Sequence, residues 1–246
     1  MDRMLYVAMS NARQMFHAQH MASNNLANAS TTGFKRDLDS VRAMPLYGPG
    51  LPTRVFAMTE RSGTDLSSGA MQETGNPLDL ALDENGWFAV IAPDGTEAYT
   101  RAGNFRLTAN GLLTTQEGLP VLGEGGPVAI PQSSDIVFGT DGTVSVRPLG
   151  QESNALAQVD RLRLVRPDPS MLEKGADGLF RMRDGSTAPL DAEVTVMQGV
   201  LEGSNVNVVE EMISMMNYQR QYELAVKAMN TANETATASA QLMRMG

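Results

Sequence analysis

The fold is decided by residues 207–243, which read NVVEEMISMMNYQRQYELAVKAMNTANETATASAQLM. Side chains in and just before this stretch recur at spacings of three and four, which aligns them on one face of a helix. Asn207 followed by Glu210 predicts an N-cap with a reciprocal capping acid, so we expect the helix to begin there. Such a helix would be roughly 55 Å long at about 1.5 Å per residue. The aligned residues are Asn205, Val208, Met212, Met215, Gln219, Tyr222, Val226, Met229, Asn233, Ala236, Ala240 and Met243.

A second, shorter seam occupies the N-terminus and stops near Asn28. Burial against the protein's own core is the usual explanation of a single short amphipathic helix. A heptad pattern that runs well beyond about 25 residues is more typical of coiled coils, so packing between subunits is the favoured interpretation. The N-terminal seam consists of Leu5, Ala8, Ala12, Met15, Gln19, Ala22 and Leu26.

The chain between these two ends is rich in glycine and in short segments typical of β-strands. The strand-like segments are 87–92, 97–101, 104–108, 144–146, 161–165 and 194–198. The dipeptides between them readily supply the positive φ angles of tight hairpins. They are Asn85-Gly86, Asp94-Gly95, Asn110-Gly111, Asp141-Gly142, Asp177-Gly178 and Asp184-Gly185. We therefore expect an antiparallel sandwich or irregular barrel.

The expected fold class is α+β, with N- and C-terminal helices packed as a coiled-coil-like pair and a central, mainly antiparallel β-domain. The expected division has four parts. They are an N-terminal helix in 1–30, an extended connector in 31–77 with a proline- and glycine-rich stretch, a β-rich domain in 78–200 and a C-terminal helix in 201–246.

The composition excludes several classes of protein. The chain has no cysteine, so disulfides, thiolate metal sites and a cysteine nucleophile are excluded. Its net charge is −9, with 19 basic against 28 acidic residues, which argues against a general nucleic-acid binder. No apolar stretch approaches the roughly 18–20 residues of a membrane span. The N-terminus lacks the apolar region of a secretory signal, so any export is expected to proceed without a cleaved signal peptide.

Residues suited to catalysis are scarce. The two histidines, His17 and His20, are three positions apart on a predicted helix, and no third ligand in the local sequence completes a metal site. Pro127, after the cluster Gly123-Glu124-Gly125-Gly126, blocks the helix that a phosphate-binding loop requires. A carboxylate pair for glycoside hydrolysis cannot be located from sequence spacing. We therefore predict no enzyme activity, no catalytic or metal-binding residues, no cofactor and no small-molecule substrate.

Three blocks of the sequence resemble the bacterial flagellar rod and hook family. Residues 23–35, SNNLANASTTGFK, are similar to its N-terminal signature, and 201–207, LEGSNVN, to its C-terminal signature. Between them, 77–82 (PLDLAL), 86–90 (GWFAV) and 99–105 (YTRAGNF) resemble the family's β-domain. The motif residues singled out are Asn24, Asn25, Leu26, Ala27, Asn28, Gly33, Phe34, Ser204, Asn205 and Val206.

The resemblance implies a structural protein of the flagellar basal body. It implies partners among the other proximal and distal rod subunits and copies of the chain itself, delivery by the flagellar type III export apparatus, and a location in the rod that spans the periplasm. Length and the Leu-Glu-Gly-Ser-Asn form favour a subunit of the proximal rod, the shaft that transmits motor torque. The alternatives are a distal-rod subunit, or a secreted carbohydrate-binding β-protein with helical oligomerisation arms.

The predicted subunit interface is formed by the helical seams, with Arg220 as a candidate polar contact. The residues assigned to it are Leu5, Ala12, Met15, Leu26, Met212, Met215, Gln219, Arg220, Tyr222, Val226 and Met229.

Overall fold

A computed structural model of the chain describes residues 2–38, 41–45, 55–59, 63–83, 85–148 and 156–245. The chain folds into two compact units. The helical unit comprises Met1–Ala29, Arg36–Asp65 and Val206–Gly246, and the β unit comprises Ser30–Lys35 and Leu66–Asn205. Both units are therefore discontinuous in sequence, since the helical unit consists of three segments and the β unit of two.

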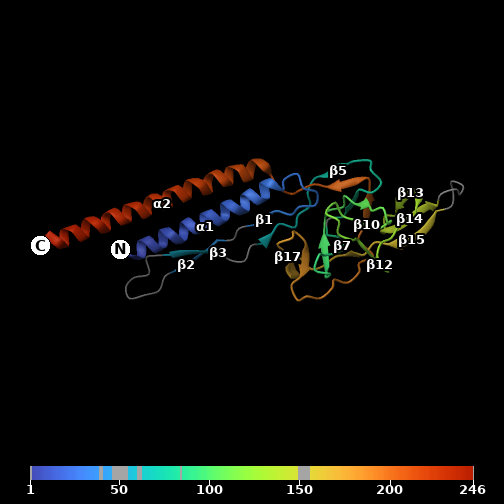
Figure 1. Cartoon of the computed structure of the whole chain (residues 1–246), viewed down its shortest axis with the longest axis horizontal. Helices are drawn as coiled ribbons and strands as arrows, with labels where there is room; N and C mark the ends of the chain where they lie inside the picture. The colour runs from blue at the N-terminus through green and yellow to red at the C-terminus, as the bar shows by residue number, and fades with distance from the viewer. Residues whose placement is uncertain are drawn as a thin grey trace. The chain divides into compact units, whose positions relative to one another are not determined.

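The helical unit contains the two long helices expected from the seams. Helix α1 spans Asp2–Ala27 and helix α2 spans Val208–Met245, and the two pack against each other in antiparallel orientation (Figure 1). The Asn207 side chain accepts hydrogen bonds from the backbone N–H groups of Val209 and Glu210, at 3.1 and 3.3 Å, so the predicted N-cap is confirmed. The Glu210 carboxylate, predicted as the reciprocal capping acid, forms an ion pair with Arg36 Nη1 at 3.3 Å.

Part of the segment expected to be an extended connector contributes two antiparallel ribbons to the helical unit. Strand β1 (Asp37–Leu38) pairs with β4 (Gly63–Thr64), and β2 (Val41–Pro45) pairs with β3 (Val55–Thr59). Residues 46–54, which include Gly48, Pro49, Gly50 and Pro52, lie outside the described residues. The division of the chain into four parts remains a prediction, and it differs from the two compact units of the structure in grouping the chain by sequence order.

The β unit is built from short strands, and every pair of strands in it is antiparallel within the described residues. Its largest sheet has five strands in the order β16-β7-β8-β18-β17, and a three-stranded sheet has the order β13-β14-β15. The pairs β5–β20, β6–β19, β9–β10 and β11–β12 complete it. In sequence order, the first eight strands of the unit are β5 (Met71–Glu73), β6 (Leu80–Leu82), β7 (Trp87–Ile91), β8 (Glu97–Thr100), β9 (Arg106–Leu107), β10 (Leu113–Thr114), β11 (Leu122–Gly123) and β12 (Gly126–Pro127). The remaining elements are β13 (Ser133–Phe138), β14 (Thr143–Pro148), β15 (Ala157–Arg161), β16 (Leu164–Val165), the 3₁₀ turn η1 (Pro169–Met171), β17 (Leu172–Lys174), β18 (Phe180–Met182), β19 (Val196–Gln198) and β20 (Val200–Glu202).

Strand β7 lies between two hydrophobic clusters, which explains its unbroken apolar sequence. Phe88 and Val90 belong to the larger cluster, whereas Trp87 and Ala89 belong to the smaller one. Because successive side chains of a strand point to opposite faces, β7 is buried on both sides. Phe88 meets Phe105 edge to face with ring centroids 5.0 Å apart. The prediction of an α+β fold with a central antiparallel β-domain is confirmed.

Glycine serves two purposes in the predicted hairpin turns. Gly95, between β7 and β8, and Gly142, between β13 and β14, have φ values of +80° and +83°. Side chains other than glycine rarely adopt this backbone conformation. Gly86 does not have a positive φ, but a Cβ at this position would collide with the Val194 side chain. The turn dipeptides therefore reflect backbone conformation at some positions and packing space at others.

Candidate functional site

The surface between α1 and α2 is lined mainly by small side chains. On α2, Ala225 and Ala232 are seven positions apart and both buried, and on α1 Ala18 and Ala22 are four positions apart and buried. Small residues at this spacing allow two helix backbones to approach closely, as in a coiled-coil-like pair. Among the helix residues whose burial the structure describes, 5–27 and 208–244, the buried ones are Ala12, Met15, Ala18, Ala22, Asn25, Glu211, Ala225 and Ala232.

The predicted interface residues are distributed over three environments. Ala12 and Met15 are buried. Leu26, Met215, Val226 and Met229 are half-buried, and Leu5, Met212, Gln219, Arg220 and Tyr222 are exposed. The contacts of these residues with another subunit stay a prediction.

The buried seam is rotated by one residue from part of the predicted seam. Ala18, Asn25, Glu211 and Ala225 are buried where the pattern indicated Gln19, Leu26, Met212 and Val226. Close packing of two helix backbones favours small side chains, so the alanines at 18 and 225, next to predicted positions, are buried. The repeated alanine at heptad spacing was the sequence signal for this seam.

Large apolar side chains instead occupy the outer faces of both helices. Met216 is 53% exposed and Leu224 is 66% exposed on α2, and Tyr6 is 65% exposed on α1. Burial of one such side chain contributes about 1.5–3 kcal/mol, so a series of them on one element marks an interaction surface. We name this set the outer apolar face, and it comprises Leu5, Tyr6, Met9, Phe16, Val209, Met212, Ile213, Met216 and Leu224.

A polar cluster joins α1, α2 and β1 within the helical unit. The Asn25 side chain donates to the backbone carbonyl of Asp37 and accepts from its N–H, both at 2.9 Å, as a neighbouring strand would do. Asn25 also donates to Glu211 at 3.3 Å, and the Arg36 Nε donates to the same Glu211 oxygen at 2.5 Å. Burial would lower the pKa of Arg36, but the charges of Glu211 and Glu210 outweigh it and raise the pKa.

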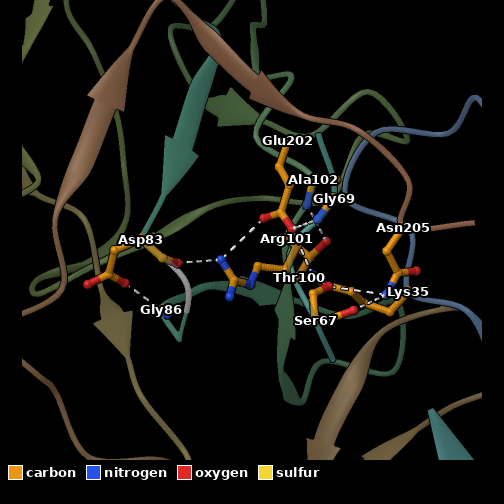
Figure 2. Close-up of polar contacts among 10 residues, drawn as sticks. All are labelled: Lys35, Ser67, Gly69, Asp83, Gly86, Thr100, Arg101, Ala102, Glu202 and Asn205. Atoms are coloured by element: carbon orange, nitrogen blue, oxygen red, sulfur yellow. Dashed lines mark hydrogen bonds and ion pairs between the residues drawn. The ribbon is translucent and has the colours of Figure 1, made fainter. Parts of the chain in front are cut away.

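A second polar cluster is buried in the β unit, and we name it the Lys35–Glu202–Arg101 cluster (Figure 2). Lys35 Nζ donates to Glu202 Oε1 and to the Ser67 carbonyl, both at 2.7 Å. Arg101 Nη1 donates to Glu202 Oε2 at 3.2 Å and to the backbone carbonyl of Asp83 at 2.6 Å. The three charged side chains are each 1% exposed.

The surroundings of this cluster supply further contacts. The Gly69 N–H donates to Glu202 Oε1 at 2.9 Å, so the carboxylate accepts from two side chains and one backbone group. The Arg101 guanidinium lies 5.2 Å from the Trp87 ring centroid, a cation–π contact. Burial lowers the pKa of Arg101, and the negative charge of Glu202 opposes this effect. A buried group of charges is tolerated because its members are paired and hydrogen-bonded.

The signature motifs converge on these two clusters. Gly33 has φ +67°, its N–H donates to the Glu202 carbonyl at 2.8 Å, and a Cβ there would collide with the backbone of Arg101. Lys174 Nζ lies 4.0 Å from the Phe34 ring centroid and donates to the Lys35 carbonyl at 2.9 Å. Each motif residue in this region therefore fits a specific backbone or charge contact.

The remaining motif residues lie near the ends of the helices. Asn28 Nδ2 donates to the Asn24 carbonyl at 2.9 Å, at the end of α1. Asn205 donates from its side chain to the Ser67 carbonyl at 3.1 Å and from its backbone to the Phe34 carbonyl at 3.3 Å. Ala27 is exposed, and Ser204 and Val206 are half-buried.

Sequence reasoning missed both polar clusters because their partners are far apart in the chain. Lys35 and Glu202 are separated by 167 positions, and Asn25 and Glu211 by 186. The available signal was the presence of charged residues inside motifs otherwise made of glycine, small and apolar residues, as in Leu201-Glu202-Gly203 and Thr100-Arg101-Ala102. Such residues are almost never fully buried unless they are paired.

The two histidines and the acidic residues form no metal-binding group in the described parts of the chain. His20 packs edge to face on Phe16, with ring centroids 4.5 Å apart. Within the described residues, no three His, Asp or Glu side chains lie close enough to hold a metal ion. Neither helix, over its described length, offers a stretch apolar and long enough to cross a membrane.

Comparison with known proteins places these features in a family. Family models of a flagella basal body rod protein, a flagellar hook protein FlgE/F/G D1 domain and a flagellar basal body rod FlgEFG protein C-terminal region match residues 5–35, 81–146 and 197–242. The flagellar basal-body rod proteins FlgF of Escherichia coli K12 and Salmonella typhimurium LT2 are 41% and 40% identical, each over 100% of both chains. A flagellar basal-body rod protein FlgG of Buchnera aphidicola subsp. Schizaphis graminum is 33% identical over 91% of this chain and 93% of its own length.

These matches, together with the antiparallel helix pair and the antiparallel β unit, define a structural protein of the bacterial flagellum. The chain belongs to the family of flagellar basal-body rod proteins and is similar to its FlgF members. Its relatives are structural rod proteins, so the predictions of the family and of a structural, non-enzymatic protein are confirmed.

Proposed function

We propose that the chain is a structural subunit of the proximal rod, in which the outer apolar face of α1 and α2 packs against neighbouring rod subunits. The neighbours are copies of this chain and other rod proteins. The 41% identity to the Escherichia coli FlgF protein over the full length, against 33% to the FlgG protein, supports the proximal position. A contact repeated from one subunit to the next in this way propagates along a filament.

The observation that carries the proposal is that small side chains of α2 are buried while large apolar ones are exposed. Ala225 and Ala232 are buried against α1, whereas Met216 and Leu224 face outward. A helix that served only the protein's own core would bury its large apolar residues first. Methionine side chains on such a surface adapt to neighbours that are related but not identical.

Delivery to this location is proposed to use the flagellar export apparatus, without a cleaved signal peptide. The rod position in the periplasm follows from the same proposal. The exposed seam and interface residues, including Met212, Gln219 and Arg220, are proposed to contact neighbouring subunits.

The test compares Met216→Glu with Asn217→Glu in the full chain. Both positions are exposed and adjacent on α2, so each variant adds one charge to the same turn. We expect Met216→Glu to abolish rod assembly and swimming, because a carboxylate would be buried against an apolar neighbour. Asn217→Glu is the matched control and should retain both. Wild-type swimming of the Met216→Glu strain, with normal protein level, would contradict the proposal.

The axial position is tested separately by electron microscopy of isolated basal bodies. An epitope inserted in the exposed turn at Gly185, which lies in the β unit, locates the chain along the rod. We expect label at the end of the rod near the inner membrane. Label along the outer section would instead assign the chain to the distal rod, and absence of a functional tagged protein from basal bodies would favour a secreted binding protein.

A further inference from the structure

The Lys35–Glu202–Arg101 cluster collects its charges from three distant parts of the chain. Lys35 ends the first segment of the β unit, Glu202 lies three residues before the end of the last, and Arg101 directly follows β8. The loop at Ser67 and Gly69 adds a carbonyl and an N–H to the same group. The cluster thus connects the two end segments of the β unit, residues 30–35 and 201–205, to Arg101 in its interior (Figure 2).

We propose that this cluster is an ionic lock that holds the end segments 30–35 and 201–205 on the β unit as one cooperative element. Each end segment contributes a charge that the other needs. The backbone hydrogen bonds between the segments, from Gly33 to Glu202 and from Asn205 to Phe34, form beside the lock. Release of either segment therefore releases the other.

The lock contains one anion and two cations, so removing the anion should be more costly than removing one cation. Glu202 is a single carboxylate that contacts two cations, Lys35 and Arg101. Loss of its charge leaves two buried cations beside each other without an anion. Loss of the Lys35 charge leaves Glu202 and Arg101 as a neutral pair. Breaking a buried pair by removing one partner is costly because the remaining charge is uncompensated, so the Glu202 side of the lock is the more sensitive.

The order of the chain gives the lock a consequence for assembly, which rests on the proposed function. The consequence holds for delivery that begins at the N-terminus, in which Lys35 arrives long before Glu202 because 167 positions separate them. The lock closes only after Glu202 has arrived, and α2 begins six residues later at Val208. The end segments of the β unit are therefore fixed only at the stage when α2 follows.

Hydrogen exchange of the full-length purified protein tests the lock. In Lys35→Met we expect amide exchange at Gly203, which donates to the Ala70 carbonyl, to accelerate about tenfold or more through local opening. In Glu202→Gln we expect the same or a larger acceleration at Gly33. The amides of Leu113 and Ile130, bonded elsewhere in the β unit, should stay within about twofold of the wild type.

The control variant is Asp135→Asn, which removes a carboxylate from an exposed pair with Arg147 in the same unit. It should leave exchange at Gly33 and Gly203 unchanged. The proposal is overturned if each lock variant affects only amides in its own segment, or if Leu113 and Ile130 accelerate as much as Gly33 and Gly203. If Glu202→Gln does not fold, Lys35→Met, which leaves a balanced pair, decides the test.

The result is independent of the proposed function. Met216→Glu tests assembly and should leave exchange at Gly33 and Gly203 unchanged. Normal swimming of Met216→Glu would therefore contradict the rod interface and leave the lock intact, whereas unchanged exchange in Lys35→Met would contradict the lock alone.

Discussion

The helical unit and the β unit bury their side chains in opposite ways. The β unit encloses large residues, among them Trp87, Phe88 and Tyr99, and pairs its buried charges internally. The helical unit buries alanines between its helices and leaves Phe16 and Met216 exposed. The β unit therefore buries its large apolar side chains within one chain, whereas the helical unit leaves many of them exposed, and we propose that neighbouring subunits cover them.

The comparison is tested most strongly by removing a phenylalanine ring from each unit. Phe88→Ala should destabilise the β unit by roughly 3–5 kcal/mol, because the ring is buried in the main cluster. Phe16→Ala should destabilise the helical unit by only about 0.5–1.5 kcal/mol, because the ring is 52% exposed and its ring contacts are with His20 and Tyr222. Denaturant unfolding followed by the fluorescence of Trp87, the only tryptophan, measures the β unit, and circular dichroism at the helical band measures the helical unit. Equal losses in the two variants would contradict the contrast.

The next effect concerns alkaline pH and the buried Tyr99. Burial raises the pKa of Tyr99 to about 12, although the Ala188 N–H, which donates to its hydroxyl at 2.6 Å, opposes the shift. The folded state thus favours neutral Tyr99. Its contribution is fully present below the ordinary pKa near 10 and is lost as pH rises through about 12.

The expected loss between these pH values is on the order of 2–3 kcal/mol of unfolding free energy. Denaturant unfolding at a series of pH values, followed by Trp87 fluorescence, measures it. In Tyr99→Phe this alkaline component should disappear. A stability that falls equally with pH in both proteins would show that Tyr99 is not responsible.

A smaller effect is expected at the polar cluster of the helical unit. Asn25→Ala removes the partner of both backbone groups of Asp37 and one partner of Glu211, which should destabilise the helical unit by roughly 2 kcal/mol. Circular dichroism at the helical band measures that unit, and Trp87 fluorescence measures the other. We expect only the helical transition to shift. A parallel shift of both signals would contradict the separation of the two units.

The smallest effect is expected at the first turn of α2. Asn207→Ala removes the side-chain acceptor of two backbone N–H groups and should cost about 1 kcal/mol of helix stability. Asn217→Ala, at an exposed position within α2, should cost nothing because alanine favours helices. Thermal unfolding followed by circular dichroism compares the two. A larger loss in Asn217→Ala would contradict the assigned cap.

The sequence predicted the elements of both units better than their contacts. The heptad spacing and the Asn207 cap predicted α2, and apolar runs bounded by glycine turns predicted β7 and β8. These features are local, since each depends on residues a few positions apart. The β1–β4 and β2–β3 pairs were not expected, because each strand is short and finds its partner across a connecting segment.

The candidate site was predicted less completely than the fold. The two helices were correctly identified, but the rotation of their seam depends on which side chains face the partner helix, and hydrophobicity alone favoured Met212 over Glu211. The Lys35–Glu202 pair required knowledge of which distant segments meet. The signature motifs contained Lys35 and Glu202, but the resemblance identified the family without indicating that these two residues meet.

Cysteine labelling tests the central claim most directly, namely that neighbouring subunits cover the outer apolar face. The chain has no cysteine, so Met216→Cys introduces a single thiol on α2, and Ser186→Cys introduces one at an exposed position of the β unit. Maleimide labelling compares the purified chain with isolated basal bodies from motile cells. We predict that the thiol at 216 reacts in the free chain and is protected in basal bodies, whereas the thiol at 186 reacts in both. Equal labelling at position 216 in the free and assembled protein would contradict the account.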